Sequence, residues 1–188
     1  MIDVIINKIR NEISSVFDEV YTWFDVNDNL LNYEPQNGGW NIRKVLEHIS
    51  LTNHFLLILI KKGTIKATAK SKNTDYAHLL IDYDLDWNKL KAIGEHQSFY
   101  WNRPEHMEPT GTADLAEIKN KLQQQLIEYL GYLDQLKNGE GILYKTTMSV
   151  NDLGKIDVYH YLLFLAQHAK RHLMQMEKIK VEFKTNLN

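Results

Sequence analysis

Two histidines near the C-terminus, in the stretch AQHAKRHLMQ (166–175), have a type and spacing that could do chemistry. On a helix, His168 and His172 would project from adjacent turns, about 6 Å apart along the axis. Both imidazoles could then reach one metal ion. The alternative is a pair of core or cleft histidines satisfied by hydrogen bonds, because the i, i+4 spacing alone is a weak signal.

A third histidine, His48, belongs to a separate amphipathic segment. The inward-facing row of that segment is Val45, His48, Thr52, Phe55 and Leu59. Residues on facing helices of a bundle meet across the core, where such folds assemble metal sites. Three neutral imidazoles with an open position form a catalytic type of coordination set that suits zinc, nickel or ferrous iron. We therefore predict one divalent ion on His48, His168 and His172.

The remaining histidines are predicted to lie away from this site. His54 is rotated about 120° from His48 on an ideal helix and should face elsewhere. His160 lies two turns before His168, either behind the ligands or at the edge of the bundle. Surface or loop positions are expected for His78, His96 and His106.

The sequence offers no obvious base for hydrolysis. The HExxH motif needs a glutamate directly after its first histidine, and Ala169 stands in that place. Glu47, next to His48, is a candidate base by adjacency only, and a solvated helix position is the alternative.

Four amphipathic helices should position these residues. Apolar residues recur at intervals of three and four in each segment. The expected helices run from 5 to a break near 25–29, from an Asn41 N-cap to Gly63, from Thr112 or Asp114 to Gly139, and from about Lys155 through Ile179. No strand pattern of any length is visible. The predicted fold is an all-α four-helix bundle.

A long connection should join the second and third helices. Its first part, 61–75, is rich in lysine and is expected to be a solvated connection, although it could also touch an anionic partner. The stretch LLIDYDLDWNKLKAI can form a short helix. Residues 102–112 read as a loop, because Pro104 and Pro109 bias the preceding residues away from helix.

The amino-acid composition excludes several kinds of site and partner. The 188 residues suit one domain spanning 1–188, and the absence of cysteine excludes disulfides, thiolate ligands and a cysteine nucleophile. A net charge of -2 gives no general attraction to nucleic acid. The longest apolar run, FLLILI, is far too short to span a bilayer, and the N-terminus lacks a signal-peptide core. A cytoplasmic protein without membrane or nucleic-acid partners is expected.

Two stretches resemble the DinB/YfiT-like metalloenzymes. In GGWNIRKVLEHI (38–49), His48 follows Trp40 by eight residues and Asn41 replaces the family's commoner Ser or Thr cap. QHAKRHLMQM (167–176) resembles the closing H-x-x-x-H-x-x-Q, with Gln175 in its last position. RPEHMEPTGT resembles the proline-containing approach to the third helix. The resemblance places the metal triad on His48, His168 and His172, whereas 63–100 shows no family signature.

The resemblance implies a broad range of activities, since members include thiol S-transferases, an isomerase and hydrolase-like proteins. The leading hypothesis is a transferase that joins a low-molecular-weight thiol to an electrophile on the metal. The alternatives are a metal-dependent hydrolase, a non-enzymatic metal-stabilised binding or stress-response module, and a bundle without metal. Arg171, between the two histidines, could steer an anionic substrate or form a structural ion pair. A homodimer is a further expectation.

Overall fold

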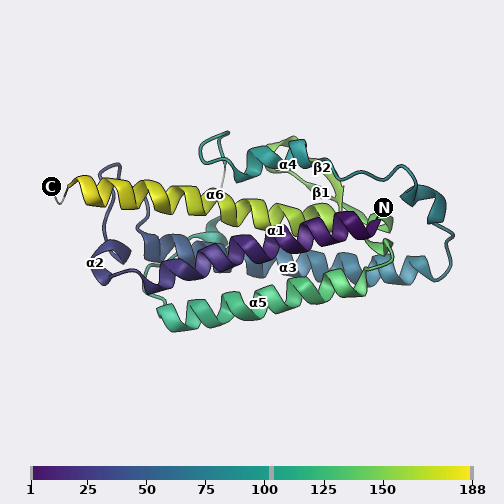
Figure 1. Cartoon of the computed structure of the whole chain (residues 1–188), viewed down its shortest axis with the longest axis horizontal. Helices are drawn as coiled ribbons and strands as arrows, with labels where there is room; N and C mark the ends of the chain where they lie inside the picture. The colour runs from purple at the N-terminus through teal and green to yellow at the C-terminus, as the bar shows by residue number, and fades with distance from the viewer. Residues whose placement is uncertain (1, 102–103, 187–188) are drawn as a thin grey trace.

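The computed structural model describes residues 2–101 and 104–186. Four long helices lie side by side along the long axis of the molecule (Figure 1): α1 (Ile2–Thr22), α3 (Ile42–Ser71), α5 (Leu115–Gln135) and α6 (Val158–Thr185). α1 and α6 run in one direction, and α3 and α5 run in the other. Because α3 and α5 are parallel, a long connection must return the chain from one to the other. The predicted all-α bundle, including that connection, is confirmed.

α6 is the most deeply buried helix. Asp157 caps its N-terminus by accepting a hydrogen bond from the backbone N–H of His160. The following sequence is apolar around nearly the whole circumference, and α6 accordingly packs against α1, α3 and α4 (Trp87–Gly94). Figure 1 shows α4 lying over the outer side of α6. In its buried first half, polar side chains such as Gln167 and His168 must be directed toward other protein groups.

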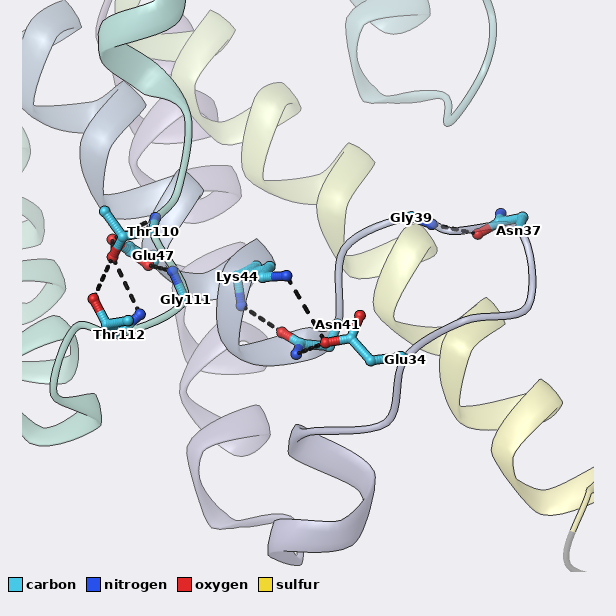
Figure 2. A network of polar contacts seen from close by, with 9 residues as sticks. All are labelled: Glu34, Asn37, Gly39, Asn41, Lys44, Glu47, Thr110, Gly111 and Thr112. Atoms are coloured by element: carbon cyan, nitrogen blue, oxygen red, sulfur yellow. Dashed lines mark hydrogen bonds and ion pairs between the residues drawn. The ribbon is translucent and has the colours of Figure 1, made fainter.

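α3 begins as predicted, with the Asn41 side chain accepting a hydrogen bond from the N–H of Lys44 (Figure 2). The prediction that it ends at Gly63 is wrong, because the helix continues to Ser71 through most of the lysine-rich segment. A Cβ on Gly63 would meet Val158 Cγ2 at 3.0 Å, so this glycine permits close approach of the start of α6 and does not terminate α3. The inward row also fails at its far end, where Leu59 is 40% exposed.

The connections contain short elements. Between α1 and α3 lie η1 (Trp23–Asp25) and α2 (Asp28–Leu31). Between α3 and α5 lie η2 (Ala77–Leu80), α4 and η3 (Glu105–Met107). α4 confirms the predicted short helix and buries Leu90 and Ile93. The expected loop at 102–112 is seen from Pro104 onward, with η3 inside it, and positions 102 and 103 lie outside the described residues.

A hairpin precedes α6 where no strand was expected. After η4 (Glu140–Leu143), β1 (Lys145–Met148) pairs antiparallel with β2 (Gly154–Asp157), with η5 (Val150–Asp152) in the turn. The predicted start of the fourth helix near Lys155 is therefore wrong, since that residue lies in β2. Strands of four residues are too short to show a clear alternating pattern. α5 also ends at Gln135, before the predicted stop at Gly139.

Within the described parts of the chain, no helix is both long enough and apolar enough to cross a bilayer.

The contact between α3 and α6 can be tested at Gly63, with Gly131 of α5 as the control. We expect Gly63→Leu to lower the free energy of unfolding by about 1–3 kcal/mol, because the new side chain meets Val158. At Gly131, in α5, a Cβ meets nothing within 4 Å, so Gly131→Leu should raise stability by about 0.5–1 kcal/mol through helix propensity. Urea unfolding of both variants measures the difference. Equal effects would show that Gly63 is not a packing glycine.

Candidate metal centre

The structure brings His48, His168 and His172 together in the interior of the bundle. His48 comes from the second turn of α3, and the other two come from the middle of α6. One ring nitrogen from each of the three lies within 4.8 Å of the others. All three side chains are buried, and the ring of Trp40 packs on His48 with centroids 4.7 Å apart.

Hydrogen bonds fix the proton position on two of the rings. The Nδ1 of His48 lies 2.8 Å from the backbone oxygen of Met107, and the Nδ1 of His172 lies 2.9 Å from Gln175 Oε1. Because both oxygens can only accept, each Nδ1 carries the proton and donates it. In its neutral form each ring then carries its lone pair on Nε2, which lies 3.4 Å from Thr52 Oγ1 in His48 and 3.1 Å from His168 Nε2 in His172. A histidine held through Nδ1–H in this way is the arrangement that orients metal-binding histidines in proteins.

The third ring contacts His172 through one nitrogen, and its other nitrogen has no hydrogen-bond partner in the described parts of the chain. His168 Nε2 lies 3.1 Å from His172 Nε2, and its buried Nδ1 has no hydrogen-bond partner among the described residues. Two imidazole nitrogens bound to one zinc ion at about 2.0–2.1 Å, with bond angles of about 90–110°, would be about 2.8–3.4 Å apart. The separation between the two α6 nitrogens lies within that range, whereas the set of three spans up to 4.8 Å, so closing all three around one ion requires a small movement of the rings. The donor set thus fits a divalent ion held by three imidazoles.

Burial keeps the two α6 rings in the form that binds metal. Loss of solvent lowers the pKa of His168 well below its ordinary value, and the neighbouring His172 and His48 lower it further. Burial likewise depresses the pKa of His172, with His48 adding to the effect. Both rings are therefore neutral near pH 7, as ligation by imidazole requires.

Glu47 supports the loop over His48. Its carboxylate is buried and accepts hydrogen bonds from Thr110 N–H at 3.1 Å, Thr110 O–H at 2.9 Å and Gly111 N–H at 2.7 Å (Figure 2). The expectation of a solvated helix position is therefore wrong. The same loop supplies the Met107 carbonyl that accepts the His48 proton. Glu47 thus holds that loop in place, and its acceptors are directed away from the histidines.

A cavity of about 420 Å³ opens onto the three histidines. Its far wall is aromatic and comes from the segment after α4, with Phe99, Tyr100 and Trp101. None of the described residues that line it is an aspartate or a glutamate. A larger cavity of about 550 Å³ lies between α3 and α5, where Glu47 and His54 contribute to its wall, but it includes none of the three histidines. Of these two cavities, the one of about 420 Å³ therefore gives access to the candidate metal site.

Arg171 faces this cavity but its donors are directed to a loop. The guanidinium donates to the backbone oxygen of Glu95, to Ser98 Oγ at 3.1 Å and to the Phe99 oxygen at 3.4 Å. It also lies over the rings of Phe99 and Trp101. Arg171 is thus structural, although through carbonyls and rings rather than through the ion pair considered from the sequence.

Of the other histidines, four do not line this cavity and one, His96, does. His160 bonds to Asp157 at 2.8 Å, His54 faces the other cavity, and His78 and His106 are exposed. His96 lies in the loop after α4, which is one of the two positions expected for it, and this loop brings it to the wall of the cavity of the three histidines. Sequence reasoning missed its place at the site, together with those of Phe99 and Trp101, because a loop carries them to the site and loops have no periodicity to read.

Comparison with known proteins agrees with this geometry. The sequence model of the DinB superfamily matches residues 8–176. The chain is also similar to the uncharacterized protein YuaE of Bacillus subtilis (strain 168), with 24% identity over 172 residues, covering 88% of this chain and 96% of that protein. No solved structure matches the chain.

The buried rings predict a loss of stability in acid for the metal-free protein. Below about pH 6.5 the unfolded chain binds protons at histidines that the folded chain keeps neutral, so stability falls as pH falls toward the depressed pKa values. The slope should reach at most about 1.4 kcal/mol per pH unit for each ring. Urea unfolding in a chelator between pH 7.5 and 5.5 measures it. A His168→Leu/His172→Leu variant should show a shallower loss, and an equal loss would refute this assignment.

Proposed function

This chain belongs to the DinB superfamily, and we propose that it is a metal-dependent enzyme whose ion is held by His48, His168 and His172. The observation that carries the proposal is the set of three buried imidazoles whose ring nitrogens lie within 4.8 Å of one another, two of them held through Nδ1 by Met107 and Gln175. Family membership and this cluster fit a metal-binding protein. Zinc, nickel and ferrous iron all suit an all-imidazole set with an open position.

For the reaction, we propose transfer of a low-molecular-weight thiol to an electrophilic small molecule. When bound, the ion supplies a positive charge that lowers the pKa of a coordinated thiol. The chain has no cysteine, so the thiol must be a second substrate. The described lining of the cavity offers no carboxylate base for hydrolysis, and Glu47 uses its oxygens on the loop. These two features favour thiol transfer over hydrolysis.

The surrounding residues orient the ligands and shield the cavity. Met107 and Gln175 hold two of the rings with their Nε2 atoms toward the centre. Phe99 and Trp101 stack on each other, with ring centroids 5.4 Å apart and 25° between the ring planes, and give the cavity an aromatic wall that an apolar electrophile could contact. Arg171 keeps that wall in place. Exclusion of water by such a wall strengthens the electrostatic contribution of the site.

The metal assignment predicts one divalent ion per chain in tag-free protein. Each of His48→Ala, His168→Ala and His172→Ala should weaken binding by more than about 100-fold, because loss of a ligand costs more than loss of a supporting hydrogen bond. Elemental analysis and calorimetric titration with zinc measure this. His54→Ala, an exposed histidine on the same helix as His48, is the matched control and should bind normally. Loss of the ion in the control with retention in His48→Ala would contradict the assignment.

The reaction assignment predicts that turnover needs both the ion and an added thiol. With a chloro-nitroarene as electrophile, a carbon–sulfur bond forms, chloride leaves and the thiol proton passes to solvent. Chelation should abolish formation of the thioether, and restoring a divalent ion should recover it. The rate should follow thiolate, with an apparent pKa below that of the free thiol. Full conjugation by chelated His168→Ala protein would overturn the assignment.

A further inference from the structure

His96 lies between two cavities next to the candidate metal site. It lines the 420 Å³ cavity of the three histidines and also a smaller one of about 170 Å³. Lys178, from α6, lines only the smaller cavity, and its Nζ lies 3.0 Å from His96 Nδ1. Nδ1 of the ring is therefore in contact with a residue of the smaller cavity, and the same ring also lines the larger one.

The contact with Lys178 determines which nitrogen of His96 carries the proton. An ammonium group has three donors and no acceptor, so Nδ1 must be the acceptor and is unprotonated. A neutral imidazole then has its single proton on Nε2. Partial burial lowers the pKa of His96, and the positive charges of Lys178 and Arg171 lower it further, which agrees with a neutral ring.

The backbone around His96 is fixed to the helix that carries two of the candidate ligands. Arg171 donates to the oxygens of Glu95 and Phe99 and to the hydroxyl of Ser98, so its bonds lie on both sides of His96 in the sequence. The Ser98 hydroxyl in turn lies 2.6 Å from the Ala92 oxygen at the end of α4. Gln97 adopts a left-handed conformation with φ of 66°, which turns the chain sharply after His96.

We propose that His96 is a ligand-binding residue, whose Nε2–H donates a hydrogen bond to an oxygen of a small carboxylate in the larger cavity. A carboxylate is favoured because Arg171 and Lys178 make the surroundings positive and no acidic side chain is among the described residues that line this cavity. Phe99 and Trp101 also line this cavity, and their aromatic side chains add a preference for an aromatic body. Lys178 is the positioning residue that sets the tautomer. This donor requires no metal ion and goes beyond the proposed reaction.

The tautomer is tested first, by imidazole ¹⁵N NMR of the metal-free full chain near pH 7.5, with His96→Phe used to assign the signals. We expect an unprotonated Nδ1 and a protonated Nε2 on His96. Lys178→Arg should retain this pattern because a donor remains, and Lys178→Met should shift the population toward Nδ1–H. A protonated Nδ1 in the wild-type chain, or no change in Lys178→Met, overturns the positioning role.

Ligand binding is tested with benzoate as the probe, added to the same metal-free protein. We expect saturable binding that perturbs the His96 Nε2–H signal, with affinity reduced at least about tenfold in His96→Phe, since a hydrogen bond to a charged group is lost. His78→Phe, which changes an exposed histidine on η2, should bind benzoate as the wild type does. Absence of benzoate binding, or equal affinity in His96→Phe, overturns the proposal. Because no ion is present, these results are independent of the metal and thiol assignments.

Discussion

The structure depends on one constraint, which is the burial of three imidazole rings where α3 and α6 meet. A buried polar group costs free energy unless it is bonded, so each ring nitrogen needs a partner inside the protein. A carbonyl of the loop around η3 supplies one partner and the Gln175 side chain supplies another. One nitrogen of each ring lies within 4.8 Å of the others, whereas His168 Nδ1 has no partner among the described residues. A divalent ion between the three rings would satisfy the nitrogens that face one another.

On each of the two helices, a buried charged residue is the sequence neighbour of a candidate ligand. Each of these two residues binds a different loop next to the site. Glu47 precedes His48 and binds the loop at Thr110 and Gly111. Arg171 precedes His172 and binds the loop from Glu95 to Phe99. The two walls of the cavity are thus attached to the same helical turns as the ligands, so ligand geometry and cavity shape are set together.

The features that could be predicted from the sequence are those that follow from the spacing of apolar residues. Spacings of three and four identified the four long helices and turned His48, His168 and His172 inward, because these are properties of single helices. The end of α3 was predicted wrongly because Gly63 allows the close approach of Val158, which is distant in sequence, and does not terminate the helix. The burial of Glu47 and the proximity of His96 to the site were missed, because these contacts come from loops that fold back onto the helices. Such tertiary contacts leave no local pattern in the chain.

X-ray absorption spectroscopy of the metal-loaded protein tests the central claim most directly, because it reports the number and type of atoms bound to the ion. For the zinc-loaded protein, the spectrum should show three imidazole nitrogens at about 2.0–2.1 Å together with one exchangeable oxygen ligand such as water. The His48→Ala protein should have one imidazole fewer. A shell made of carboxylate and water oxygens, or an imidazole count that is unchanged in His48→Ala, would contradict the three-histidine centre.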